Sequence, residues 1–225
     1  MTQQTTLVLL RHGETFWNAL DKAQGHQDIA LNEKGLLQAQ EVAKHLKQKH
    51  PELAFIYSSD LIRAYQTAEA LSQIFSLPIS KTPQLREVSF GEAEGLTAPE
   101  IAHRYGDKKK ELDEKYPERK DRWKIAEIPG AETLSTALLR FTSCLQTIGK
   151  AHPGQTCAVV THGKLLKLLL AEMQNLDDVP SIPNCSLVPI TYCLVSDSLI
   201  CRRTKTLHRV DVSLCKTVCK ANAAA

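Results

Sequence analysis

Two short apolar segments, far apart in the chain, each lead into a His-Gly pair. Uninterrupted apolar runs of four or more residues are typical of strands that are buried on both faces of a sheet. In open α/β sheets, ligands bind just beyond the carboxyl ends of such strands. The sequence therefore predicts two buried strands that bring two histidines to one edge of a sheet: residues 7–10 before Arg11-His12-Gly13, and residues 157–160 before Thr161-His162-Gly163.

The rest of the chain alternates between helical and extended patterns. This alternation predicts an α/β fold with three layers (α/β/α) and a mostly parallel central sheet. We expect one domain over residues 1–225, with an insertion over the edge of the sheet at about 91–130 that contains two polar helices. The expected helices are 33–49 with Asn32 as its N-cap, 61–75 with Ser59 or Asp60 as its N-cap, 99–105, 107–116, 132–150 and 164–173. The further strands are 55–58, 187–195 and 199–203, and residues 14–29 are expected to form a loop.

Composition narrows the class of protein. With 225 residues, of which 43% are hydrophobic and 24% charged, the chain is long enough for one sizeable core. A net charge of +3 is too small to indicate nucleic acid as the main partner. We expect no signal peptide and no membrane-spanning stretch. The seven scattered cysteines form no Cys-x-x-Cys pair, which favours free thiols in the cytoplasm, and periodicity leaves monomer and homo-oligomer equally open.

Four basic side chains should meet at the predicted edge: Arg11, His12, His162 and Arg63, which falls in the first turn of the helix after strand 55–58. Histidine is a common metal ligand, but two arginines beside it oppose a cation. Arginine instead offers a planar fork of donors that matches phosphate oxygens. The pattern therefore favours a phosphate pocket without a metal.

A neutral imidazole in such a pocket is a competent nucleophile toward phosphorus. The reaction then needs charge neutralisation, which the arginines supply, and a proton for the leaving alkoxide. Glu87, in a loop, is the candidate acid/base, and Glu14 is its rival. The predicted chemistry requires no cofactor.

Five blocks of sequence, taken together, resemble the histidine phosphatase superfamily, in the branch that includes phosphoglycerate mutases. They run in the family's order from about residue 6 to 163, with a further similar block, Pro183-Asn184-Cys185-Ser186, beyond them. The five blocks are Leu7-Val8-Leu9-Leu10-Arg11-His12-Gly13-Glu14-Thr15, Gln24-Gly25 with 31–35, 58–68, Leu85-Arg86-Glu87 with Phe90-Gly91-x-x-Glu94-Gly95, and Val160-Thr161-His162-Gly163.

The resemblance implies a phosphoglycerate mutase-like fold and specific roles. His12 would be the phosphorylated nucleophile, and Glu87 the acid/base, with Glu14 structural. Arg11, Arg63 and His162 would hold the phosphoryl group. The resemblance also places Asn184 near the site. The remaining substrate-binding or phosphate-binding positions would be Asn18, Gln24, Gly25 and Gly163. It implies no metal.

Three functions remain open. A phosphatase passes the phosphoryl group to water, a mutase primed by 2,3-bisphosphoglycerate returns it to a second oxygen, and a binding module does neither. The Phe90-Gly91-x-x-Glu94-Gly95 block favours the phosphatase, acting on a small phosphorylated substrate whose identity the sequence leaves open. Lys164 departs from the family pattern and could add positive charge near the pocket, and Arg119, Lys120 and Arg122 could bind a second anionic group.

Overall fold

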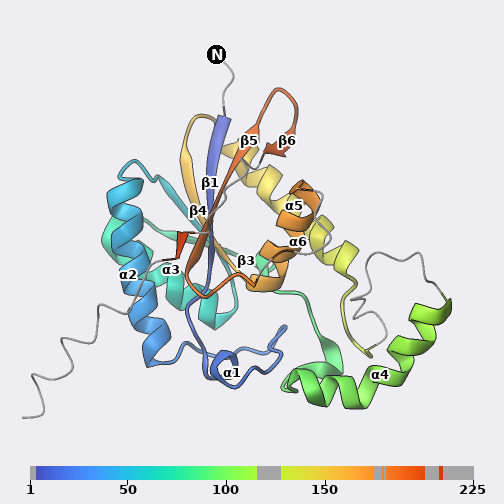
Figure 1. Cartoon of the computed structure of the whole chain (residues 1–225). Coiled ribbons are helices and arrows are strands. Elements are labelled where there is room, and N and C mark those ends of the chain that lie inside the picture. Colours follow the sequence, from blue (N-terminus) through green and yellow to red (C-terminus); the bar gives the residue numbers. More distant parts are fainter. Residues whose placement is uncertain (1–3, 116–127, 175–178, 180, 201–207, 210–225) are drawn as a thin grey trace, which may run out of the picture.

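The computed structural model describes residues 4–115, 128–174, 179, 181–200 and 208–209, and for 107–115 and 208–209 only the backbone. One sheet lies at its centre (Figure 1). The strands are β1 (Gln4–Arg11), β2 (Phe55–Ser59), β3 (Ile79–Thr82), β4 (Thr156–Thr161), β5 (Ser186–Cys193), β6 (Ser198–Ile200) and β7 (His208–Arg209).

The strand order is β3-β2-β4-β1-β5-β6, and β7 also pairs with β5. The four strands β3, β2, β4 and β1 run parallel, as the alternation of helices and strands predicts. Beyond β1 the sheet becomes antiparallel, because β5 runs against β1 and forms a hairpin with β6. The α/β class is thus confirmed, as a mixed sheet with a parallel half.

Helices cover both faces of the sheet (Figure 1), namely α2 (Glu33–Lys49) and α3 (Ile62–Phe75) on one and α5 (Leu134–Ala151) and α6 (Gly163–Gln174) on the other. Alternate residues of β1 serve the two layers. Leu7 and Leu9 pack with α5 and α6, whereas Val8 and Leu10 pack with α2 and α3. Burial of each such side chain contributes about 1.5–3 kcal/mol, so β1 ties both layers together.

Helix starts differ in how far the sequence predicts them. The Asn32 side chain caps α2 as expected, accepting the Gly35 N–H at 2.7 Å. For α3, Ser59 or Asp60 was the expected cap, but Leu61 holds that position. The Ile62 N–H instead donates to the Asp28 carboxylate at 2.6 Å, so a distant loop caps this helix.

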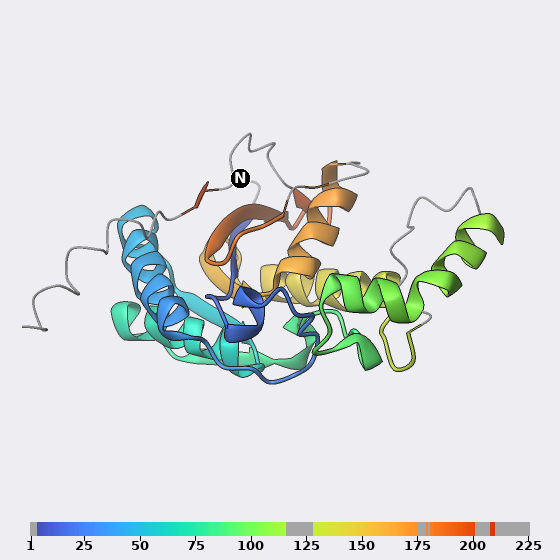
Figure 2. The same ribbon diagram turned by 60° about the horizontal axis from the view of Figure 1, so that its bottom comes forward.

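Two further elements differ from the expectation. The predicted loop 14–29 contains a short helix, α1 (Phe16–Ala19). A capping box between Thr15 and Asn18 stabilises the start of this helix. The two polar helices expected at 99–105 and 107–116 are one helix, α4 (Ala98–Lys115), which extends away from the sheet (Figures 1 and 2). Gly106 does not divide it, because one glycine costs a helix only about 1 kcal/mol.

Some expectations fall outside the described residues, including Arg119, Lys120, Arg122 and the last part of strand 199–203. Of the cysteines that the structure describes, Cys144, Cys157, Cys185 and Cys193 are free thiols. Among the helices of the described part, none combines the length and the apolar character needed to cross a bilayer.

Two helical glycines give a matched test of packing. A Cβ added to Gly149 in α5 would lie 2.4 Å from Cγ of buried Tyr192, whereas one added to Gly106 in α4 would meet nothing within 4 Å. We expect Gly149→Ala to lower the free energy of unfolding by about 1–3 kcal/mol through overpacking, and Gly106→Ala to leave it unchanged or raise it by up to about 1 kcal/mol. Urea denaturation of both variants measures this. Equal effects would contradict the packing at Tyr192.

Candidate active site

The carboxyl ends of β1 and β4 lie side by side, as the paired His-Gly motifs predict. The register pairs Arg11 with Thr161, and the His12 N–H donates to the Thr161 carbonyl at 3.0 Å. The next residue of each strand is a histidine, and the two rings lie 5.2 Å apart between centroids. Figure 2 brings this edge of the sheet, with α1, to the front.

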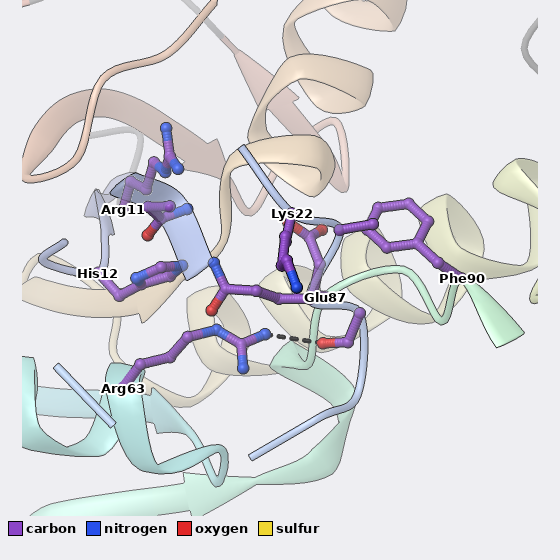
Figure 3. Close-up of a pocket in the computed structure, with 10 residues that line it drawn as sticks. Arg11, His12, Lys22, Arg63, Glu87 and Phe90 are labelled. Carbon is purple, nitrogen blue, oxygen red and sulfur yellow. Dashed lines mark hydrogen bonds between the residues drawn. The ribbon is translucent and has the colours of Figure 1, made fainter. Parts of the chain in front are cut away.

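A cavity of about 130 Å³ opens in front of these strand ends (Figure 3). Seven predicted site residues line it: Arg11, His12, Asn18, Gln24, Gly25, Arg63 and Glu87. Lys22, Ala23 and Phe90 line it too; the sequence analysis gave none of them a place at the site, although Phe90 belongs to the Phe-Gly-x-x-Glu-Gly block. Lys22 lies two positions before Gln24, a predicted site residue. Its closeness to Gln24 in the sequence is the signal that could have indicated a place for Lys22 at the site.

The hydrogen bonds of His12 determine which ring nitrogen is available. Its Nδ1 lies 2.7 Å from the Gly13 carbonyl oxygen, which can only accept, so Nδ1 carries the proton. In the neutral ring, Nε2 then keeps its lone pair. Burial, and secondly the charges of Arg63 and Arg11, hold the pKa of His12 well below its usual range. His12 is therefore a neutral imidazole with Nε2 as its basic atom.

Arg63 is buried to 1% exposure and is held by the loop that contains Gly25. Its Nη1 and Nη2 donate to the carbonyls of Gln27 and Gly25, each at 2.7 Å, and the dashed line in Figure 3 marks the second bond. Burial lowers the pKa of Arg63 to about 10, so it remains charged at neutral pH. Nε has no partner among the described residues and remains available to an anion.

Arg11 and Gly163 form a second contact at the edge. The Arg11 guanidinium donates to the Ile182 carbonyl and lies against the start of α6. A Cβ on Gly163 would approach Arg11 Nε to 3.0 Å, so Gly163 provides space for this arginine rather than lining the cavity. Burial lowers the pKa of Arg11, although nearby carboxylates, Glu87 first, oppose this.

His162 lies beside His12, with 5.2 Å between the ring centroids, and is not among the residues that line the cavity. It is fully buried, and neither ring nitrogen has a hydrogen-bond partner in the described part of the chain. Burial, followed by the charges of Arg63, His12 and Arg11, lowers the pKa of His162 well below its usual range. The two histidines therefore meet at one edge of the sheet, as the sequence predicts. Within the described residues, both ring nitrogens of His162 lack a partner.

Two amide side chains are turned so that their donors are left for the cavity. The Asn18 oxygen accepts from Thr15 and from Asn184, both at 3.2 Å, and the Gln24 oxygen accepts from the Thr15 hydroxyl at 3.0 Å. Each amide nitrogen of Asn18 and Gln24 is thereby available for an anion. Asn184 also donates to the His12 carbonyl at 3.0 Å, so the expected proximity of Asn184 to the site is confirmed.

The Glu87 carboxylate caps the start of α6. Oε2 accepts from the Lys164 N–H at 3.0 Å, and Oε1 accepts from Leu165 at 3.2 Å and from Val88 at 3.0 Å. Lys164 thus contributes its backbone to this contact, while burial lowers the pKa of its ammonium and nearby Glu87 opposes that shift. Figure 3 shows Glu87 in the cavity opposite His12.

Glu14, the rival acid, lies elsewhere. Its carboxylate pairs with Lys34 at 2.6 Å and accepts from Asn32 at 3.0 Å, and it does not line the cavity. Glu94, of the Phe-Gly-x-x-Glu-Gly block, organises the loops around the cavity instead, because its carboxylate accepts the N–H groups of His26 and Phe90. Gly25, with φ of +53°, leaves the space that this carboxylate occupies.

The site thus combines a neutral imidazole, two buried cations and two amide side chains around one small cavity. Preorganised donors of this kind can stabilise the charge of a phosphoryl group in the transition state of its transfer. Within the described residues, no three His, Cys, Asp or Glu side chains gather closely enough to hold a metal ion.

The buried neutral histidines should make stability depend on pH. In the unfolded chain His12 and His162 bind protons below their ordinary pKa of 6.5, whereas the folded state, with lowered pKa values, does not. The free energy of unfolding therefore falls as the pH falls below about 6, by about 1.4 kcal/mol per pH unit for each histidine. Urea titrations of the wild type and of His12→Asn between about pH 7 and pH 5 measure this. A slope that the substitution leaves unchanged would contradict the buried neutral state of His12.

Comparison with known proteins agrees with this geometry. The model of the histidine phosphatase superfamily (branch 1) matches residues 7–193. Phosphoglycerate mutase-like protein 4 of Arabidopsis thaliana is 38% identical over 72% of this chain and 68% of its own length. A metal-independent phosphoserine phosphatase of the same plant is 34% identical over 82% of this chain and 75% of its own.

A solved structure shows the same fold. The phosphoglycerate mutase of Bacillus anthracis superposes with a TM-score of 0.76 at 25% identity, covering 89% of this chain and 92% of that one. The region that the family model matches, residues 7–193, extends from within β1 to the end of β5 and includes every residue that lines the cavity. On this evidence the chain belongs to the histidine phosphatase superfamily.

Proposed function

We propose that this protein is a phosphatase that hydrolyses a small phosphomonoester, without a metal, through a phosphohistidine at His12. The observation that carries the proposal is the state of His12, whose Nδ1 is tied to Gly13 and whose neutral ring lies beside Arg11 and Arg63. Relatives named as phosphatases, including the phosphoserine phosphatase, support the reaction class.

In the first step, the lone pair of His12 Nε2 attacks phosphorus and the bond to the alkoxide oxygen breaks. The guanidinium groups of Arg63 and Arg11 stabilise the charge on the equatorial oxygens, and the amides of Asn18 and Gln24 add neutral donors. We propose that a ring N–H of His162, whose ring centroid lies 5.2 Å from that of His12, donates to the same group. Two fixed arginine charges take the part that a metal ion plays in other phosphoryl-transfer sites.

In the same step, Glu87 gives a proton to the leaving alkoxide, and it then takes a proton from the water that attacks the phosphohistidine. Its Oε2 accepts one backbone N–H, which leaves a lone pair on that oxygen to carry the proton. Hydrolysis releases inorganic phosphate and restores neutral His12. Each proton lost by Glu87 in the first half is recovered in the second.

Two variants test these roles. We expect His12→Ala to abolish phosphate release from p-nitrophenyl phosphate and from phosphoserine, and to remove acid-labile protein phosphate. Glu87→Gln should lower kcat/KM for phosphoserine, which reports the phosphorylation of His12, by about 10²–10⁴-fold, and kcat/KM for the aryl ester much less, because that leaving group needs no proton. Slower hydrolysis of the phosphohistidine should lower kcat for both esters. Phosphate release and phosphohistidine trapping measure both. Full activity of His12→Ala would overturn the proposal in favour of a binding module or another nucleophile.

A mutase is the second candidate, because relatives with that name match the chain and its fold. Phosphorus NMR with 3-phosphoglycerate separates the two activities. Formation of 2-phosphoglycerate that requires 2,3-bisphosphoglycerate would establish the mutase. Release of inorganic phosphate without the primer would establish the phosphatase. A cytoplasmic location stays a prediction from the sequence.

Lys22 should select among phosphomonoesters. Its side chain lines the cavity beside Phe90 (Figure 3), so it adds a positive charge beyond those of the two buried arginines. We expect Lys22→Met to raise KM roughly fivefold, or about 1 kcal/mol, for 3-phosphoglycerate, which has a second anionic group, and to leave KM for p-nitrophenyl phosphate unchanged. Lys34→Met, which removes an exposed lysine that pairs with Glu14, is the matched control. Equal changes in KM for both substrates would contradict this selectivity.

A further inference from the structure

Arg140 of α5 lies outside the cavity wall, yet it binds the segment that contains Glu87. Its Nη1 donates to the carbonyls of Gln84 at 2.9 Å and Arg86 at 2.8 Å, and its Nη2 donates to the Glu87 carbonyl at 2.8 Å. Nε and Nη2 each also donate to a Glu132 carboxylate oxygen at 2.8 Å. All five N–H donors of the guanidinium are therefore used. Three bind backbone carbonyls of the 84–87 segment, and two bind the Glu132 carboxylate.

The Glu87 carbonyl accepts a second hydrogen bond, which comes from the loop that contains Gly25. The His26 ring Nε2 lies 2.8 Å from this oxygen, and His26 belongs to the loop whose Gly25 carbonyl holds Arg63. Glu87 is thus held at its backbone by α5 and by the cavity loop, and at its carboxylate by the start of α6. Its backbone has no regular helix or strand to fix it, since it follows the short turn η1 (Pro83–Leu85).

The Arg140–Glu132 ion pair is well suited to hold this segment. Both side chains are only 16% exposed, so solvent weakens their attraction less than it does for surface pairs. Glu132 lies just before α5 and accepts from Nε and Nη2 along one edge of the planar guanidinium, which leaves Nη1 and the second N–H of Nη2 for the three carbonyls. Lysine offers three donors from a single atom and cannot form this fork.

We propose that Arg140, oriented by Glu132, is a positioning residue that aims the Glu87 carboxyl at the leaving-group oxygen. This inference rests on the acid/base role proposed above for Glu87. Arg140 acts through the backbone of Glu87 and does not touch the substrate. A shift of about 1 Å in a catalytic group can cost roughly a hundredfold in rate. Loss of the hydrogen bonds from Arg140 to this backbone should therefore impair proton transfer while phosphate binding persists.

Leaving groups of different acidity test the inference. We expect Arg140→Met to lower kcat/KM for phosphoserine roughly ten- to hundredfold and kcat/KM for p-nitrophenyl phosphate much less, with inhibition by inorganic phosphate nearly unchanged because Arg11 and Arg63 are intact. Arg140→Lys should show an intermediate loss of the same kind. Arg104→Met, which removes an exposed arginine that pairs with Glu92, is the matched control and should change neither rate.

The outcomes separate this inference from the proposed function. If Arg140→Met lowers kcat/KM equally for both esters, Arg140 is only structural and the inference is wrong. If Glu87→Gln itself shows no dependence on the leaving group, the proposed role of Glu87 fails instead. Should Arg140→Met not fold, Glu132→Gln replaces it, since it keeps the arginine and weakens its orientation. We expect a smaller loss there, again selective for phosphoserine, and an equal loss for both esters would overturn the inference.

Discussion

The parallel pairing of β1 with β4 is the interaction on which the site depends. Its register places Arg11 opposite Thr161, so the chain leaves both strands with a histidine at the same level. A shift of one residue would turn each side chain of the strand to the other face of the sheet. The three buried leucines and the one buried valine of β1 prevent such a shift, because each face already packs against its own pair of helices.

Buried positive charge is the second constraint. Arg63 and Arg11 are both largely removed from water, which is costly unless donors and charges are satisfied. Loop carbonyls take part of each fork, and the carboxylates of Glu87, Asp28 and Glu94 offset the charge of Arg63. The remaining donors and the two neutral histidines are arranged for an anion. The cost of burying these groups is thereby linked to the chemistry that they can perform.

Loops from distant parts of the chain complete the cavity. Asp28 caps α3, Glu94 receives the N–H groups of His26 and Phe90, and Arg140 holds the carbonyls before and at Glu87. These contacts explain why the sequence analysis found the strand-end residues and missed others. Arg11 and His12 stand beside a clear strand pattern, whereas Lys22 and Arg140 acquire their places only from contacts across the fold.

The sequence alone determined the α/β class, both histidines at one edge and the arginine at the start of α3, because apolar periodicity acts over a few residues. Glu87 was predicted from its loop position and from the resemblance of its block to the family, and the structure places it on the cavity wall. Tertiary structure decided the rest. It joined α4 into one helix, turned Glu14 toward Lys34, placed His162 beside His12 but off the cavity wall and gave Gly163 the task of making room for Arg11. Each of these outcomes depends on which neighbour packing supplies, and such neighbours are far apart in the sequence.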